Sequence, residues 1–112
     1  MSNGLVFLLL LFSAVLEAGG DAMVRSGLHG AGLGPRIAWM AAGAVVLFAY
    51  GVTVNLPPWD FGRLLGVYVT LFFVVAQVIS TFVFGKPPTL PIFIGGAMIV
   101  AGGLTMTFWT QN

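Results

Sequence analysis

The stretch that decides the fold is Leu5–Val24, LVFLLLLFSAVLEAGGDAMV, an apolar run about as long as a membrane-spanning helix. A helix needs roughly 20 predominantly apolar residues to cross about 30 Å of hydrocarbon. Glu17 lies in the middle of this run, in a chain with only four Lys or Arg and three Asp or Glu residues. An ionised carboxylate at such a depth costs on the order of 3 kcal/mol, so these groups are usually functional. Glu17 is therefore the first candidate for a functional residue.

The composition of the whole chain excludes a water-soluble globular protein. Of its 112 residues, 59% are hydrophobic and 6% are charged, whereas soluble domains average about 25% charged residues. A chain this small would expose much of its apolar surface, and its few charges could not cover that surface. The lipid bilayer is therefore the expected solvent. The chain has no cysteine, so it forms no disulfide and offers no thiolate.

Proline and glycine divide the chain into four apolar blocks. We predict helices over about residues 4–24, 37–56, 61–84 and 90–109. Blocks of this length without alternation of polar and apolar residues favour helices, because the strands of a membrane barrel are about 10 residues long. The prediction is an all-α membrane protein with one domain, residues 1–112, in which four transmembrane helices form a bundle that pairs as a dimer. The glycine-rich stretch 25–36 is expected to be a flexible connection.

The positions of the basic residues indicate an orientation. Arg25, Arg36 and Lys86 lie at the first and third connections, and only Arg63 lies at the second. By the positive-inside rule, the first and third connections face the cytoplasm and both termini lie outside. The excess of basic residues on one side is only three against one. A chain that inserts in both orientations would show an equally small excess, so dual topology stays open. We expect an integral protein of a bacterial-type inner (plasma) membrane, whose first block is retained because it lacks a signal-peptide pattern.

One face of the first block gathers small and polar side chains. At 100° per residue this face holds Leu10, Ala14, Glu17, Ala18, Asp21 and Arg25. It is expected to look toward a bundle interior or a water-filled cavity. Asp21 and Arg25 stand four residues apart and could form an ion pair, which would leave Glu17 without a cation.

Two roles are open for Glu17. As a structural group it would stay neutral and bond a neighbouring helix, with polar candidates that all lie on the third block: Thr70, Gln77, Ser80 and Thr81. As a functional group it would exchange a proton against a cation, because desolvation disfavours the charged form of a carboxyl group. Proton and cation would then compete for one site.

An enzyme is not expected. The single histidine, His29, lies in the glycine-rich connection, so neither a catalytic triad nor a metal cluster is suggested by the sequence. The glycine pairs at 19–20, 95–96 and 102–103 lack the lysine of a phosphate-binding loop. Their seven-residue spacing on the fourth block instead predicts a groove of small residues, used within one chain or between two. No cofactor, metal ion or nucleic acid is expected.

Several motifs, in their order and spacing, resemble the small multidrug resistance-type transporters of the drug/metabolite transporter superfamily, with likeness to their YnfA-like relatives. The motifs are the mid-helix acid in LEAGG (16–20), NLP (55–57), FGR (61–63) followed by Tyr68, FGK (84–86) followed by LP (90–91), and IVAGGL (99–104). The resemblance covers nearly the whole chain.

The resemblance implies a proton-coupled exporter of small organic cations that works as a homodimer, commonly antiparallel, in which Glu17 of each copy faces a shared cavity. Tyr68 would line the site, and the fourth helix would make the dimer contact through Gly95, Gly102 and Gly103. The accessory positions would be Ala14, Ala18, Asp21, Arg25 and Gln77.

The chain departs from this pattern where aromatic residues are expected. Ala42 and Leu47 stand at such positions on the second block, and the segment after Tyr68 has no tryptophan. An aromatic cage that holds a quaternary ammonium ion by cation–π attraction is therefore expected to be incomplete. Two alternative functions remain: a non-transporting membrane subunit that binds a partner protein or lipid, and a carrier for a metabolite or a lipid head group.

Overall fold

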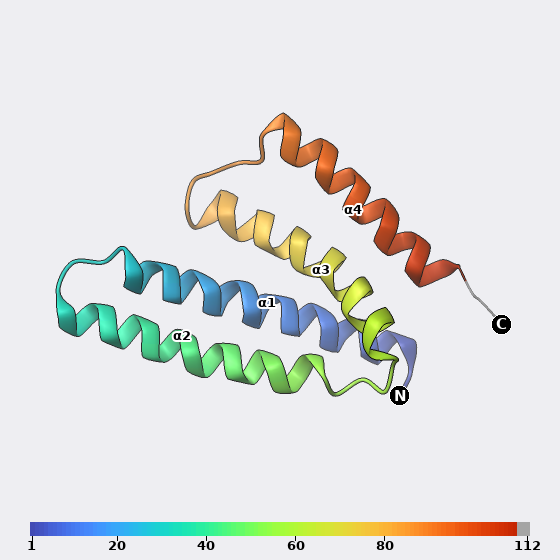
Figure 1. Ribbon diagram of the computed structural model, residues 1–112, viewed down its shortest axis with the longest axis horizontal. Coiled ribbons are helices and arrows are strands. Elements are labelled where there is room, and N and C mark those ends of the chain that lie inside the picture. The colour runs from blue at the N-terminus through green and yellow to red at the C-terminus, as the bar shows by residue number, and fades with distance from the viewer. Residues whose placement is uncertain (110–112) are drawn as a thin grey trace.

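The computed structural model describes residues 1–109 and consists of four helices (Figure 1). The helices are α1 (Asn3–Leu28), α2 (Leu33–Val54), α3 (Phe61–Phe82) and α4 (Leu90–Phe108). Because a helix rises 1.5 Å per residue, lengths of 19 to 26 residues correspond to about 28 to 39 Å. All four are long and apolar enough to cross a bilayer. The prediction of an all-α membrane fold with four helices is confirmed.

The connection between α1 and α2 is shorter than the glycine content suggested. Both helices extend into the stretch 25–36, and only residues 29–32 separate them. Glycine weakens a helix by about 1 kcal/mol relative to alanine without ending it, and Pro35 lies in the first turn of α2, where proline is tolerated. A Cβ at Gly27 would lie 2.6 Å from the Met40 side chain. The missing side chain thus lets the two helices meet beside their connection.

The helices α2 and α3 end two residues earlier than predicted. Asn55 caps α2, and its side-chain amide donates a hydrogen bond of 2.7 Å to the carbonyl of Gly51. After α3 the chain reverses at Gly85, whose φ of 65° is in the left-handed region that suits glycine. The amide of Lys86 then donates to the carbonyl of Ser80 at 2.9 Å.

The helices form a flat array in the order α2, α1, α3, α4 (Figure 1). The Cα atoms extend 55 × 34 × 19 Å. Within the described part of the chain, α1 packs against both α2 and α3, whereas the backbone of α4 lies close to α3 alone. Most large apolar side chains of α2 and α4 are exposed, as expected where lipid covers them. One chain is therefore an open layer of helices with α1 and α3 in its middle.

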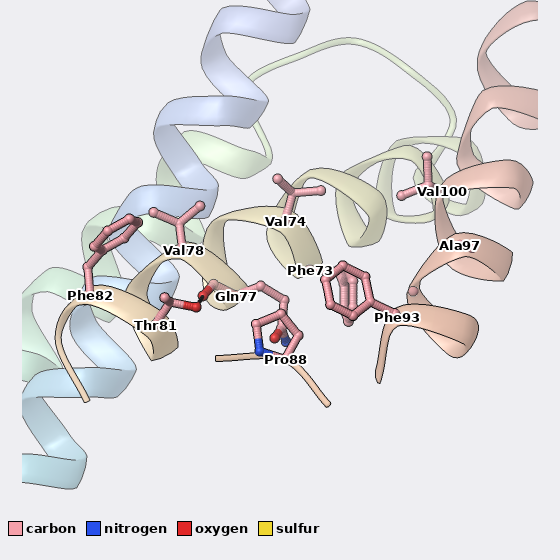
Figure 2. Close-up of a pocket in the computed structure, with 11 residues that line it drawn as sticks. Phe73, Val74, Gln77, Val78, Thr81, Phe82, Pro88, Phe93, Ala97 and Val100 are labelled. Atoms are coloured by element: carbon pink, nitrogen blue, oxygen red, sulfur yellow. Dashed lines mark hydrogen bonds between the residues drawn. The ribbon is translucent and has the colours of Figure 1, made fainter. Parts of the chain in front are cut away.

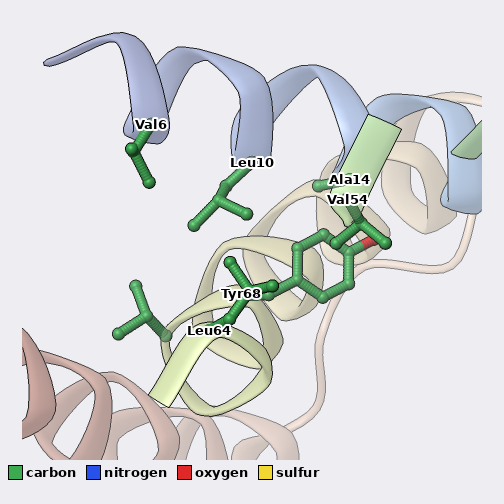
Figure 3. Close-up of a cluster of buried hydrophobic side chains, with 7 residues drawn as sticks. Val6, Leu10, Ala14, Val54, Leu64 and Tyr68 are labelled. Atoms are coloured by element: carbon green, nitrogen blue, oxygen red, sulfur yellow. The ribbon is translucent and has the colours of Figure 1, made fainter. Parts of the chain in front are cut away.

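A cluster of buried side chains joins α1 to α3 in the half of the molecule that holds the N-terminus (Figure 3). Its members are Val6, Leu10, Ala14, Val54, Leu64, Val67 and Tyr68. Leu10 is fully buried and Tyr68 is 3% exposed. This packing sets the register of α3 against α1, and so it places the hydroxyl group of Tyr68.

Two glycines of α4, seven residues apart, let it approach α3. A Cβ at Gly96 would lie 2.6 Å from the ring of Phe73, and a Cβ at Gly103 would lie 2.6 Å from the Cβ of Thr70. The Thr70 hydroxyl also donates a long hydrogen bond of 3.4 Å to a carbonyl of α4. The distance between α3 and α4 therefore depends on glycine at both positions.

We expect Gly103→Ala to lower the free energy of unfolding by about 1–3 kcal/mol, because the added methyl group overpacks the contact with Thr70. Gly51→Ala is the matched control, because it makes the same change inside a helix, α2, and its methyl group would meet no atom within 4 Å. Thermal unfolding of both variants in detergent measures the difference. Equal melting temperatures for the two variants would contradict the close contact between α3 and α4.

Candidate functional site

Glu17 lies on the face of α1 that packs against α3. Two alanines lie beside it on this face. Ala14, about one turn earlier, is 0% exposed, and Ala18, the next residue in the sequence, is 6% exposed. Small side chains at these positions leave room beside the carboxyl group for a large residue of α3. Glu17 itself is half-buried. The acid identified from sequence therefore lies between two helices that can span the membrane, and it is partly accessible.

Tyr68 of α3 is the hydrogen-bond partner of Glu17. Its hydroxyl group donates to Glu17 Oε1 at 2.7 Å. The same hydroxyl lies 3.4 Å from the carbonyl oxygen of Ser13. Because a tyrosine has one hydroxyl proton, the short bond to the carboxyl oxygen uses it, and the longer contact adds little. None of the polar candidates expected on α3 takes this place.

Two further aromatic rings flank Tyr68. The centroid of the Tyr50 ring, from α2, lies 5.7 Å from that of the Tyr68 ring. The ring of Phe72, four residues farther along α3, has its centroid 6.0 Å from that of Tyr68. The planes of both pairs are inclined by about 30°, at 31° and 29°. The Glu17 carboxyl group thus contacts Tyr68, whose ring lies near two others, and a carboxylate near aromatic rings can hold an organic cation through charge attraction and cation–π contact.

Sequence reasoning missed Tyr50, although a signal was present. The chain has only two tyrosines. A buried tyrosine needs a hydrogen-bond partner for its hydroxyl group, and lipid offers none. Two tyrosines within membrane-spanning segments therefore favour positions near the same polar group. From the sequence, aromatic positions of the second block were considered only near Ala42 and Leu47. Tyr50 lies nearer the end of α2 and was therefore not considered.

Asp21 and Arg25 lie on the same side of α1 as Glu17, farther toward its C-terminal end. Both are exposed, and both line a groove of about 260 Å³ between α1 and α3. The guanidinium carbon of Arg25 lies 5.7 Å from the centroid of the Phe84 ring, a cation–π contact. Phe72 lines the inner part of this groove and also stacks on Tyr68. The groove therefore leads toward the Glu17 site.

Gln77 lies in a different place from the one expected. It lines an apolar groove of about 490 Å³ between α3 and α4, together with Phe73 and Phe93 (Figure 2). The carbonyl of Gln77 accepts a hydrogen bond of 2.9 Å from the Thr81 hydroxyl. The structure brings together Glu17 and Tyr68, but it places Gln77 on the side of α3 that faces α4.

The glycines expected at the dimer contact divide into two groups. Gly103 is buried against Thr70 within the same chain. A Cβ at Gly95 or Gly102 would meet no atom within 4 Å, so these positions are open on the surface of α4. Of the three, only Gly95 and Gly102 can serve a contact outside the chain without a change in the packing of α3 on α4.

His29 caps the C-terminal end of α1 in the exposed connection to α2. Within residues 1–109, no group of three or more His, Asp or Glu side chains is arranged to hold a metal ion. No residue set in the described part of the chain is therefore assigned to a metal.

Comparison with known proteins adds one relative. No family model matches the chain, and no solved structure was found to match it. A UPF0060 membrane protein from Herpetosiphon aurantiacus is 26% identical over 106 residues, which cover 92% of this chain and 93% of the relative. This similarity supports the YnfA-like part of the resemblance. Together with the four apolar helices, it identifies an integral membrane protein that lies in a lipid bilayer.

Proposed function

We propose that the protein is a proton-coupled exporter of small organic cations, with Glu17 as the shared site for proton and cation. The observation that carries the proposal is the 2.7 Å hydrogen bond from the Tyr68 hydroxyl to the Glu17 carboxyl group. It joins two helices that are each suited to cross the membrane. Ionisable groups at such positions commonly mark ion and substrate pathways.

The chemistry of the exchange follows from the carboxyl group. In its ionised form Glu17 attracts a cation, and Tyr68 holds one carboxyl oxygen in place by donating its proton. Binding of a proton neutralises the site, so the organic cation loses its main electrostatic attraction. The rings of Tyr50 and Phe72 add cation–π contacts that favour organic cations over strongly hydrated metal ions.

The proposal includes a homodimer, as the resemblance implies. One chain is a layer only 19 Å deep between Cα atoms, and Glu17 is half-buried at its surface. A second copy would enclose the site and bring a second Glu17 to the same pathway. The two acids would then titrate as a coupled pair. The open positions Gly95 and Gly102 on α4 offer a small-residue surface for this contact.

Glu17→Gln is expected to abolish proton-coupled flux of guanidinium or quaternary ammonium compounds into proteoliposomes, because the amide neither binds a proton nor carries a charge. Currents after addition of the cation measure this loss. Asp60→Asn is the matched control: it also removes one carboxylate, but Asp60 lies at the start of α3 and makes no side-chain capping bond there. Flux with unchanged pH dependence in Glu17→Gln would refute the proposed site, and absence of flux in the wild type would favour the non-transporting alternatives.

Tyr68→Phe is expected to weaken cation binding roughly 10- to 100-fold where a proton competes for Glu17, because the lost hydrogen bond, worth about 1.5–3 kcal/mol, favours the ionised carboxylate over the protonated form. The variant keeps the ring that packs between Tyr50 and Phe72. Equilibrium binding of a fluorescent cation to the purified protein measures the affinity. Tyr68→Leu, which also removes the ring, should bind more weakly still. Wild-type affinity in Tyr68→Phe would show that the hydroxyl group has no part in holding the carboxylate for the cation.

A further inference from the structure

The two ends of the helix array differ in charge. The end that holds the first and third connections carries Arg25, Arg36 and Lys86, with Asp21 as the acid nearest to them along α1 (Figure 1). At the opposite end, the connection between α2 and α3 has Asp60 close in sequence to its one basic residue, Arg63. The excess of positive charge therefore lies at the end that holds the first and third connections.

The groove between α1 and α3 opens at this positive end. Its volume is about 260 Å³, and its lining includes three alanines, Ala18 and Ala22 from α1 and Ala76 from α3, together with Asp21 and Ile79. Larger rings close it at either end, Phe72 on the inner side and Phe84 at the mouth. The alanine side chains leave space between the two helices, and most of the surface that lines the groove is apolar.

Two basic residues lie at or beside the mouth of this groove. Arg25 lines the mouth and lies over the ring of Phe84. Ser80 lines it from α3, and two hydrogen bonds tie Lys86 to Ser80: the Lys86 amide donates to the Ser80 carbonyl at 2.9 Å, and the Ser80 hydroxyl donates to the Lys86 carbonyl at 3.0 Å. The Arg25 side chain is thus held at this opening, and the backbone of Lys86 is fixed to Ser80, one of the residues that line it.

We propose that this groove binds one anionic phospholipid from the leaflet at the positive end. Its phosphate lies between Arg25 and Lys86, and the upper part of one acyl chain lies along Ala18, Ala22 and Ala76. Charge complementarity selects the lipid, since basic residues at a membrane surface attract anionic head groups at about 1 kcal/mol each. Asp21 lies one helical turn, about 6 Å, deeper than Arg25 and so below the level of the phosphate.

An acyl chain in this position would end against Phe72, the ring that stacks on Tyr68. The lipid site is therefore adjacent to the Glu17 site and shares Ala18 and Phe72 with it, but its charged residues, Arg25 and Lys86, are different ones. Its existence does not depend on whether the protein transports cations, so the two proposals are tested separately.

The test is native mass spectrometry of the full-length protein in detergent, titrated with phosphatidylglycerol or phosphatidylcholine of identical acyl chains. We expect one phosphatidylglycerol per chain to bind in preference to phosphatidylcholine. Arg25→Gln combined with Lys86→Gln should weaken phosphatidylglycerol binding roughly thirtyfold, which corresponds to about 1 kcal/mol for each charge. Arg63→Gln is the matched control, because it removes one cation at the opposite end, and it should leave the preference intact.

A second variant tests the groove itself. Ala76→Leu fills the space lined by small residues without changing charge, and it should weaken binding of both lipids through loss of the acyl-chain position. If the double variant does not fold, Arg25→Gln alone, with an expected loss of about fivefold, answers the same question. Equal binding of the two lipids to the wild type, unchanged binding in the charge variants, or displacement of lipid by a second copy of the chain would each overturn the proposal.

Discussion

The Tyr68 hydroxyl group and the Glu17 carboxyl group meet between two membrane-spanning helices, and the surrounding structure serves to keep them together. An ionised carboxylate deep in a bilayer costs on the order of 3 kcal/mol, and a tyrosine hydroxyl without a partner in lipid is also unfavourable. A single hydrogen bond of 2.7 Å gives both the carboxyl group and the hydroxyl group a partner. The small residues Ala14 and Ala18 permit the close approach, and the packing of α3 on α1 sets its register.

Much of the fold could be predicted from the sequence because it follows from chain composition and length. Four apolar blocks separated by proline and glycine define four helices, and the small-residue face of the first block marks the surface that carries Glu17. The partner of Glu17 could not be predicted in the same way. Tyr68 lies 51 residues away in the chain, and its alignment with Glu17 depends on how Leu10, Leu64 and Val67 interlock. Periodicity within one helix carries no information about that register.

The glycines show the same limit on sequence reasoning. Adjacent glycines are equivalent in the sequence, but a helix turns by 100° per residue, so only one of each pair faces a given neighbour. Gly20 meets α2 while Gly19 has open space, and Gly103 meets α3 while Gly102 has open space. The contacts made within the chain therefore leave Gly95 and Gly102 at the surface, where the proposed second copy would lie. Likewise, Phe72 links the Glu17 site to the groove of Asp21 and Arg25 only through tertiary packing.

The central claim is that proton and organic cation compete for Glu17, and proton release on cation binding tests it most directly. Purified protein in weakly buffered detergent solution is mixed with a quaternary ammonium compound, and the change in pH is recorded over a range of starting pH values. The wild type should release protons over a limited pH range, and Glu17→Gln should release none at any pH. Equal proton release by the two proteins, or cation binding by the wild type without any proton release, would contradict the claim.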